Sequence, residues 1–189
     1  PRTLEMAVTG IREMSTLATA PEDRHPILTF VGPRSDKQIA AAIRRELLRE
    51  GQIFFVHNRV QSINRIASQI AELVPEARVA VAHGKLSEHQ LEQTVVDFWE
   101  RKYDVLVSTT IIETGLDIAN ANTIIIDAAD KYGLSQLHQL RGRVGRGAAA
   151  SACVLLYATN DSGRVGPTAK ERLRAMQETN DGFELSLLF

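Results

Sequence analysis

The sequence predicts an α/β fold with a mostly parallel sheet, and two observations carry this prediction. Six short apolar runs alternate along the chain with segments whose apolar residues recur at helical spacing. The runs are continuously apolar, which is typical of strands buried on both faces of a parallel sheet with helices above and below. These strand-like runs are ILTFV (27–31), IFFVH (53–57), RVAVAH (78–83), DVLVST (104–109), NTIIID (122–127) and ACVLLY (152–157).

The predicted helices lie between these strands, and several have recognisable ends. The helix after the first strand is expected to stop at Gly51, because glycine is common just past a helix C-terminus. The helix after the second strand is expected to end before Pro75, since proline cannot continue a helix. A Ser or Thr that precedes a Gln or Glu by three residues forms a capping box. This spacing predicts two further helix starts, at Ser87 with Gln90 and at Thr168 with Glu171.

Composition limits the classes of protein to consider. The 189 residues suit one large domain or a domain with extensions. The formal net charge is −1, so any contact with nucleic acid must be local, because proteins that hold nucleic acid by bulk charge are basic. The single cysteine, Cys153, is predicted to be a buried strand residue, which suits a reducing compartment. With no leader and no run of about 20 apolar residues, we expect a soluble, cytoplasmic protein.

Polar side chains directly follow three of the predicted strands. In a parallel sheet, ligands bind beyond the carboxyl ends of the strands, where the loops converge. Ser, Thr, Asn and the N-termini of helices hold phosphate groups without much net charge. One polar loop start is weak evidence for a phosphate site, but three at one edge of a sheet are better evidence. The three groups are His57, Asn58 and Arg59; His83, Gly84 and Lys85; and Ser108, Thr109 and Thr110.

The sequence lacks the motifs by which such a fold usually holds a nucleotide. Gly84 and Lys85 resemble the end of a P-loop, but Leu86 follows where Ser or Thr is required, and Val79 takes the place of the first glycine. GRVGRG (142–147) has the wrong glycine spacing for a dinucleotide-binding turn and follows a helical segment. No acidic pair follows a strand, and the five histidines show no metal-ligand spacing. The sequence therefore predicts no metal site.

Three arginines lie among glycines in QLHQLRGRVGR (136–146), directly after an apolar pattern that predicts a helix. Arginines supplied from a second lobe or subunit can stabilise the transition state of phosphoryl transfer, an effect of roughly 10³–10⁵ in rate. Glycines let the backbone turn sharply and approach a partner closely. A solvated basic turn or a short RNA-binding segment would fit the same residues, and this segment alone does not decide between the alternatives.

Four segments, in this order, resemble motifs of the superfamily 2 helicases. IFFVHNRV (53–60) is similar to the fourth motif, and VAVAHGKL (79–86) to the element that follows it. VSTTIIETGLDIANANTIII (107–126) resembles the fifth motif, and QLHQLRGRVGR the sixth, a Q-x-x-G-R-x-G-R element. The resemblance implies a three-layer RecA-like, P-loop NTPase-type domain that lacks its own P-loop. The matching residues are Thr109, Thr110, Glu113, Gly115 and Asp117 in the fifth motif, and Gln139, Gly142, Arg143, Gly145 and Arg146 in the sixth.

Within that superfamily, two groups of proteins are similar to this chain. PRTLEM (1–6), HNRV (57–60) and ELVPEARVAVAHG (72–84) resemble the transcription-repair coupling factors, which are bacterial double-stranded DNA translocases. GAAASACVLLY (147–157) and RLRAMQETNDGFELS (172–186) look more like the fork-reversing helicase RecG. The first resemblance implies a parent protein that removes stalled RNA polymerase and recruits excision-repair proteins. The second implies fork reversal in recombination and repair, and the sequence leaves both open.

The resemblance also implies a division of the chain. Residues 1–26 would be a connector from a first RecA-like lobe, 27–160 the RecA-like helicase C-terminal domain, and 161–189 the start of a helical extension that belongs to the translocation region. ATP and Mg²⁺ would be held mainly by the first lobe, which carries the P-loop and the acidic box in this family. The chain would then be inactive alone. A stand-alone nucleic-acid-binding module that keeps the fold without catalysis is the alternative from another class.

The resemblance assigns roles to individual residues. Arg143 and Arg146 would be the catalytic arginines that reach the γ-phosphate of ATP, because arginine is always charged and forks to phosphate oxygens. They would then have to lie toward the sheet edge that bears the threonines. Arg141 is expected to be structural, and Trp99 to pack its helix against the sheet. The other expected ATP-binding residues are Gly115, Asp117, Gln139 and Gly142, with a turn cap as the alternative for Asp117; the expected DNA-binding residues are Asn58, Arg59, His83, Gly84, Thr109 and Thr110.

Overall fold

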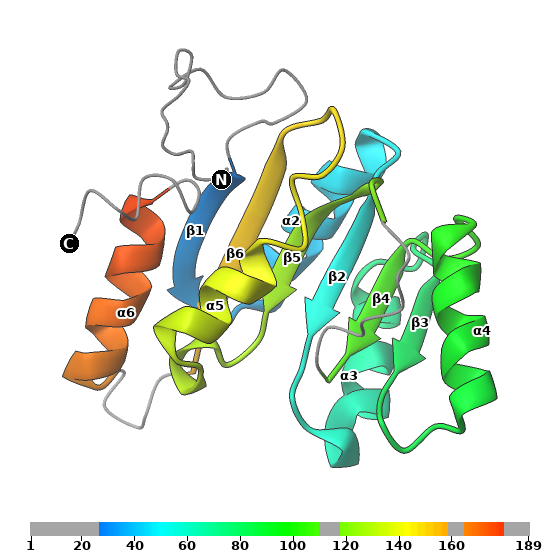
Figure 1. Ribbon diagram of the computed structural model, residues 1–189, viewed down its shortest axis with the longest axis horizontal. Coiled ribbons are helices and arrows are strands. Elements are labelled where there is room, and N and C mark those ends of the chain that lie inside the picture. Colours follow the sequence, from blue (N-terminus) through cyan, green and yellow to red (C-terminus); the bar gives the residue numbers. More distant parts are fainter. Residues whose placement is uncertain (1–26, 110–117, 159–164, 180–189) are drawn as a thin grey trace, which may run out of the picture.

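The computed structural model describes residues 27–109, 118–158 and 165–179. Within these ranges six strands form one sheet in the order β1-β6-β5-β2-β4-β3, and every neighbouring pair is parallel (Figure 1). The predicted α/β fold with a mostly parallel sheet is confirmed. Each strand-like run of the sequence corresponds to one strand: β1 (Ile27–Pro33), β2 (Gln52–Val56), β3 (Val79–Ala82), β4 (Val105–Ser108), β5 (Ala121–Ile126) and β6 (Ser151–Tyr157).

Helices cover both faces of this sheet and produce a three-layer arrangement (Figure 1). The strands are added first in one direction along the sheet and then in the other, and right-handed crossovers therefore place the connecting helices on opposite faces. One face carries α2 (Asp36–Leu48) and α3 (Val60–Leu73), and the other carries α4 (Glu88–Trp99), α5 (Leu134–Arg141) and α6 (Pro167–Glu178).

The central strands contribute to two hydrophobic cores, one on each face. In β2, Ile53 and Phe55 belong to the core beneath α2 and α3, whereas Phe54 belongs to the core beneath α4, α5 and α6. The ring of Phe54 contacts that of Phe98 in α4, with centroids 5.6 Å apart. Burying a side chain of this size contributes about 1.5–3 kcal/mol. Burial on both faces therefore explains why the strand is continuously apolar.

The two predicted capping boxes have different outcomes. Ser87 is the N-cap of α4 as predicted, because its Oγ accepts from the Gln90 N–H and the Gln90 Oε1 accepts from the Ser87 N–H, both at 3.1 Å. The capping box predicted at Thr168 is wrong, since α6 begins at Pro167 with Gly166 as its N-cap. Proline suits the first helical position because its φ is fixed near the helical value and its missing N–H would have no partner there.

The end of α2 also differs from the prediction. The helix ends at Leu48, and Glu50 instead of Gly51 adopts a left-handed φ, of 62°. A Cβ at Gly51 would clash with the carboxylate of Glu46, which would have to move to make room. Glu46 is a buried carboxylate that accepts a hydrogen bond from Thr123 of β5.

Three other predictions concern single residues of the helices and strands. α3 ends at Leu73, before Pro75, as expected. Cys153 is confirmed as a buried strand residue, and burial raises the pKa of its thiol to about 12. The prediction for Trp99 is wrong, because this side chain is 49% exposed and α4 is held in the core by Phe98 instead.

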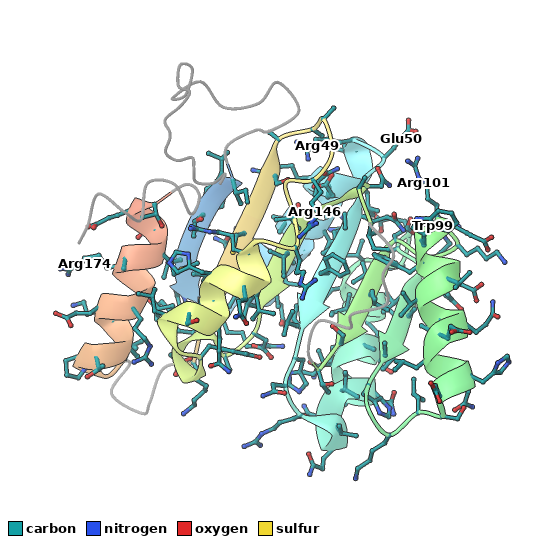
Figure 2. The ribbon with its side chains drawn as sticks, viewed as in Figure 1. Arg49, Glu50, Trp99, Arg101, Arg146 and Arg174 are labelled. Carbon is teal, nitrogen blue, oxygen red and sulfur yellow. The ribbon has the colours of Figure 1, made fainter. Side chains whose placement is uncertain are left out.

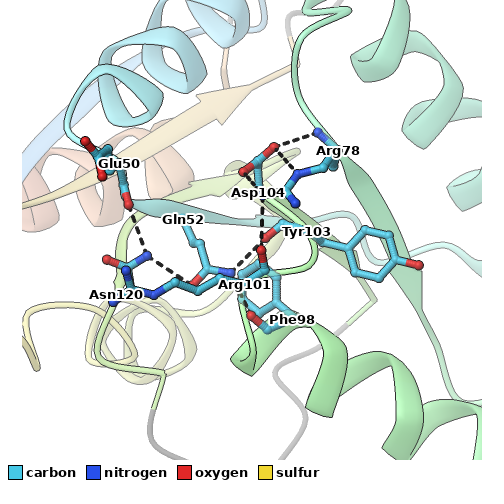
Figure 3. A network of polar contacts seen from close by, with 8 residues as sticks. All are labelled: Glu50, Gln52, Arg78, Phe98, Arg101, Tyr103, Asp104 and Asn120. Carbon is cyan, nitrogen blue, oxygen red and sulfur yellow. Dashed lines mark hydrogen bonds and ion pairs between the residues drawn. The ribbon is translucent and has the colours of Figure 1, made fainter.

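A network of polar contacts joins the amino ends of several strands (Figure 3). Its centre is the buried amide of Gln52, whose Nε2 donates to the carbonyl oxygens of Phe98 at 2.7 Å and Tyr103 at 2.8 Å. The Gln52 Oε1 accepts from Nδ2 of Asn120 at 3.2 Å. The amide thus fixes the end of α4 and the turns before β4 and β5 relative to β2.

Arg78 and Asp104, which precede β3 and β4, form the outer part of this network (Figure 3). The Asp104 carboxylate accepts from the Arg78 backbone N–H at 2.8 Å, from Nη2 at 3.0 Å and from Nε at 3.1 Å. Burial alone would raise the pKa of Asp104, but the hydrogen bonds and the charge of Arg78 lower it below its ordinary value.

Residues 1–26 and 180–189 lie outside the described residues, so the division into connector, domain and extension stays a prediction. Helix α6 lies in the predicted helical extension. In the part of the chain that the structure describes, every helix is too short or too polar to cross a lipid bilayer.

Candidate functional site

Residues that directly follow three strands lie side by side at the carboxyl edge of the sheet. They follow β2, β4 and β3, which are direct neighbours in the sheet. Neighbouring strands are about 5 Å apart, so the three strand ends span roughly 10 Å. We call these residues the turn row: Asn58 and Arg59 after β2, Thr109 after β4, and His83 and Gly84 after β3. They are five of the six residues expected to bind DNA, and the sixth, Thr110, lies outside the described residues.

Asn58 and Arg59 form the tip of the turn between β2 and α3. Both are exposed, and the structure assigns neither side chain a hydrogen bond or ion pair with another described residue. Arg59 is the N-cap of α3, with φ −146° and no side-chain hydrogen bond to the helix, and no acidic residue lies in the first turn. The first N–H groups of α3 therefore keep their positive partial charge at this edge. This arrangement suits an anionic ligand such as phosphate.

His83 and Gly84 form the turn between β3 and α4. The Lys85 N–H donates to Nδ1 of His83 at 3.2 Å, and the Leu86 N–H donates to the His83 carbonyl oxygen at 3.2 Å. Because Nδ1 accepts a hydrogen bond, the ring proton of His83 is on Nε2, from which it can be donated to a ligand. A Cβ on Gly84 would have no described atom within 4 Å. The packing of the chain therefore does not require glycine at this position.

Four polar side chains next to the turn row are connected in series by hydrogen bonds. We call them the relay: Arg34, Asp127, His57 and Ser62. His57 bonds through Nδ1 to Asp127 Oδ2 at 2.8 Å and through Nε2 to Ser62 Oγ at 2.7 Å. Arg34 Nε donates to the other oxygen, Asp127 Oδ1, at 3.1 Å. Sequence reasoning missed Asp127, although it directly follows an apolar strand as His57 does. Nearby, burial and the charge of Asp127 raise the pKa of Tyr132 to about 12.

Arg141, at the end of α5, is almost completely buried and holds the end of α6. Its Nη1 donates to Thr29 Oγ1 at 2.9 Å and to the carbonyl oxygens of Met176 at 3.0 Å and Thr179 at 2.6 Å. These contacts confirm the expectation that Arg141 is structural. Its Nη2 lies 3.2 Å from Nδ1 of His138. Burial, and then the charge of Arg141, lower the pKa of His138.

The other two arginines belong to the glycine–arginine segment (142–147), which follows α5. Arg143 is half-buried, whereas Arg146 is exposed and donates from Nε to the Gly142 carbonyl oxygen at 3.4 Å (Figure 2). Gln139, on α5, and Gly142 are exposed as well. Most of the residues expected at the sixth motif are thus at the surface of the described chain.

The two later glycines of this segment are needed by the fold itself. Gly145 has a φ of 84°, in the left-handed region that favours glycine, and a Cβ there would lie 3.1 Å from Cδ1 of Ile27. A Cβ on Gly147 would lie 2.5 Å from the carbonyl oxygen of Ala119. The sharp turn and the close approach expected of these glycines are both present. The backbone approaches Ile27 and Ala119 of the same chain, however, and not a partner.

The backbone of the glycine–arginine segment does not lie at the sheet edge that bears Thr109, where the arginines were expected. Gly145 lies against Ile27, the first residue of β1, and Gly147 lies against Ala119, just before β5. The glycine–arginine segment is therefore near the amino edge, whereas Thr109 follows the carboxyl end of β4. The reason is the direction of α5, because a helix that connects parallel strands returns the chain from the carboxyl edge to the amino edge.

Two predicted ATP-binding residues, Gly115 and Asp117, lie outside the described residues. Among the residues that are described, no three His, Cys, Asp or Glu side chains are grouped as metal ligands would be. The described residues of the turn row and of the glycine–arginine segment offer hydrogen-bond donors and guanidinium groups. Both suit phosphate oxygens.

Comparison with known proteins gives close relatives. The transcription-repair-coupling factor of Mycobacterium bovis is 59% identical over 181 residues, which are 96% of this chain and 14% of that protein. The transcription-repair-coupling factor of Staphylococcus epidermidis is 46% identical over 190 residues, with 99% of this chain and 16% of that protein covered. This chain thus spans about one seventh of the length of these relatives.

Solved structures agree with this similarity. RecG bound to a three-way DNA junction superposes with a TM-score of 0.74 and 34% identity, over 90% of this chain and 22% of the RecG chain. The C-terminal domain of the DEAD-box protein Dbp5 superposes with a TM-score of 0.57 and 15% identity, over 81% of this chain and 84% of that domain. The second likeness shows the RecA-like fold alone. The helicase conserved C-terminal domain matches residues 37–148, which is more than half of the sequence, and the chain belongs to this family.

Proposed function

We propose that this chain is the C-terminal motor lobe of an ATP-dependent double-stranded DNA translocase of the transcription-repair-coupling type. Membership of the helicase family supports a motor role. The 59% identity to a transcription-repair-coupling factor, against 34% to RecG, supports the type. Fork reversal of the RecG type is the alternative, and the lower identity does not favour it, although the RecG structure superposes over 90% of this chain.

The observation that carries the proposed contact with DNA is the turn row. It presents the exposed donors of Asn58 and Arg59 and the partly exposed side chains of Thr109 and His83 on three adjacent strand ends, beside a helix N-terminus without a side-chain cap. These groups can bind consecutive backbone phosphates of one strand of the duplex. Phosphate contacts fix position but carry no sequence information. A motor that moves along arbitrary sequence requires contacts of this kind.

ATP, as the substrate, would lie between this lobe and a first RecA-like lobe that holds most of it together with Mg²⁺. The exposure of Arg146 supports this proposal, because an exposed guanidinium can reach a nucleotide held by a neighbouring lobe. One lobe could then face DNA and ATP at the same time. Arg143 and Arg146 would reach the γ-phosphate, and the other proposed contacts are Gly115, Asp117, Gln139 and Gly142.

The proposed partners of the parent protein include more than DNA and the first lobe. RNA polymerase and excision-repair proteins would bind through other parts of the longer protein, in the cytoplasm. The isolated chain would not hydrolyse ATP. In a cycle of ATP binding and hydrolysis, ATP would favour the closed arrangement of the two lobes only if it bound that arrangement more tightly than the open one.

The arginine roles are tested in the longer, two-lobe protein. Arg143→Ala and Arg146→Ala are each expected to slow ATP hydrolysis by about 10³, because each removes charge that stabilises the transition state. The affinity for ATP should change little. Arg174→Ala is the control, since Arg174 is exposed on α6 (Figure 2). Unchanged turnover in both test variants would favour the non-catalytic module.

A second experiment separates the two candidate activities. The full-length protein is mixed with RNA polymerase stalled on duplex DNA, and release of the polymerase is measured with and without ATP. ATP-dependent release supports the transcription-repair-coupling type. Fork regression without release supports the RecG type.

A further inference from the structure

The relay closes a ring around the tip of the turn between β2 and α3. Starting from the strand, the Arg59 N–H donates to the His57 carbonyl oxygen at 2.9 Å, and the Ser62 N–H donates to the Arg59 carbonyl oxygen at 3.3 Å. The contact of His57 Nε2 with Ser62 Oγ, at 2.7 Å, completes the ring. Asn58 and Arg59 lie between the two ends of the ring, and both are exposed. The ring therefore limits the motion of the tip without using either exposed side chain.

Burial and charge hold the relay in one arrangement. The side chains of His57 and Asp127 are 13% and 8% exposed. Asp127 Oδ2 lies 2.8 Å from His57 Nδ1, while Oδ1 accepts from Arg34 Nε at 3.1 Å. An ionised carboxylate only accepts hydrogen bonds, so the proton in the contact with His57 is on Nδ1. In the neutral ring, Nε2 is then an acceptor and the Ser62 hydroxyl donates to it.

The relay also reaches three strands of the sheet. Arg34 directly follows β1, His57 follows β2 and Asp127 follows β5. The His57 N–H donates to the Ser108 carbonyl oxygen of β4 at 2.8 Å, and the Asp127 N–H donates to the Val56 carbonyl oxygen at 3.0 Å. The side chain of His57 is thus fixed relative to the strand that carries Thr109, the next residue of the turn row.

We propose that His57, held by Asp127 and bonded to Ser62, is a positioning residue that sets Asn58 and Arg59 in place for a backbone phosphate of the DNA strand. The proposal rests on the proposed function, because it gives the relay a role in the same contact with DNA. Ser62, His57 and Asp127 also have the order of a nucleophilic triad. The positioning role is favoured because the Ser62 hydroxyl closes the turn that carries two exposed donors.

The test compares serine variants of α3 in the two-lobe protein. Ser62→Ala removes the hydroxyl that closes the ring, Ser62→Thr restores a hydroxyl, and Ser68→Ala is the matched control because Ser68 is exposed on the same helix. ATP hydrolysis is measured against the concentration of double-stranded DNA at several salt concentrations. Ser62→Ala is expected to raise the half-saturating DNA concentration by about threefold to tenfold, the effect of one hydrogen bond.

Two further readouts distinguish positioning from a general structural role. In Ser62→Ala, kcat at saturating DNA and KM for ATP should be unchanged. The dependence of DNA affinity on salt should become shallower by up to about one phosphate contact, a slope of about 0.9. Ser62→Thr should restore both the affinity and the salt slope, and Ser68→Ala should change neither.

Different results would overturn the positioning role and the proposed function. If Ser62→Ala binds DNA like Ser68→Ala, or if kcat falls with no change in DNA affinity, the positioning role is overturned. Covalent labelling of Ser62 by a fluorophosphonate would show a nucleophile and would also overturn it. If ATP hydrolysis by the wild-type protein does not depend on DNA, the proposed function is refuted instead. Failure of the positioning role and failure of the proposed function are therefore distinguishable.

A spectroscopic measurement tests the relay without relying on DNA. In the ¹⁵N-histidine-labelled chain at pH 8, NMR should show the His57 proton on Nδ1 and none on Nε2. Asp127→Asn should alter this pattern, because the carboxylate that selects the tautomer is gone. A proton on Nε2 of the wild-type ring would overturn the relay even if a serine variant failed to fold.

Discussion

The two edges of the sheet are both lined by polar residues, but these residues have different partners. At the amino edge, Gln52 satisfies its amide within the chain, and Arg78 pairs with Asp104 (Figure 3). At the carboxyl edge, Asn58 and Arg59 are exposed at the tip of a turn that is held by hydrogen bonds of its own backbone and of the relay. Polarity at a strand end therefore does not identify a binding site. What distinguishes these residues at the two edges is whether their polar groups are already paired within the described chain.

The largest expected effect is at the amino edge. Gln52→Leu leaves the carbonyl oxygens of Phe98 and Tyr103 without the donor that they use now. Each buried group that loses its partner costs about 1–3 kcal/mol, so we expect a loss of roughly 3 kcal/mol in the free energy of unfolding. Chemical denaturation of the chain measures this. Gln61→Leu, at an exposed position of α3, is the control and should change stability by less than about 0.5 kcal/mol. Equal stability of the two variants would contradict the difference between the edges.

Gly147 and Gly84 differ in how closely the folded chain packs around them, and a smaller effect on stability is expected from this difference. Gly147→Ala places a Cβ 2.5 Å from the Ala119 carbonyl oxygen, whereas Gly84→Ala meets no described atom within 4 Å. Overpacking of this kind costs about 1–3 kcal/mol. Thermal unfolding should show a lower Tm for Gly147→Ala and an unchanged Tm for Gly84→Ala. A lower Tm for Gly84→Ala would mean that the turn row, too, serves the stability of the chain.

Arg59→Ala should separate binding from stability. Arg59 is exposed and has no side-chain role in capping α3, so the free energy of unfolding should change by less than about 0.5 kcal/mol. In the two-lobe protein, DNA affinity should fall about equally for all sequences, and the slope of log affinity against log salt should decrease by about one. Arg65→Ala, at an exposed position of α3, is the control. An unchanged salt slope would show that Arg59 does not contact a phosphate.

The smallest expected effect concerns His138. Burial and the nearby Arg141 lower its pKa in the folded chain, so the folded state resists protonation of this ring. The contribution is fully present above the ordinary pKa of about 6.5 and is lost as the pH falls below it. The free energy of unfolding should therefore decrease on acidification, and His138→Gln should make this decrease shallower. His89→Gln, at an exposed position of α4, should leave the decrease unchanged.

Most of the fold could be predicted because local sequence and tertiary packing agree. Continuously apolar strands and the cap at Ser87 act over a few residues, and all were found. The cap at Thr168 was misplaced because Pro167 takes the first helical position, and Trp99 was misassigned because its neighbour Phe98 fills the core. Spacing alone does not say which of two adjacent residues faces inward.

The candidate site could be predicted in part. The turn row follows from strand ends, which the sequence marks clearly. Asp127 and Ser62 were missed because their contacts with His57 join residues 70 and 5 positions apart in the sequence. The position of the glycine–arginine backbone near the amino edge was missed, because it depends on the path of α5 and not on any motif. Pairing within the chain is a property of the three-dimensional structure. Sequence reasoning therefore identifies polar residues, but it does not show which of them lack a hydrogen-bond partner.

The order of the strands has a mechanical consequence. β2, β4 and β3 are joined by continuous backbone hydrogen bonds, so their three ends cannot slide past one another without breaking the sheet. The spacing of the three strand ends is therefore constant. Under the proposed function, an advance along the duplex would come from displacement of this unit as one rigid body against the neighbouring lobe.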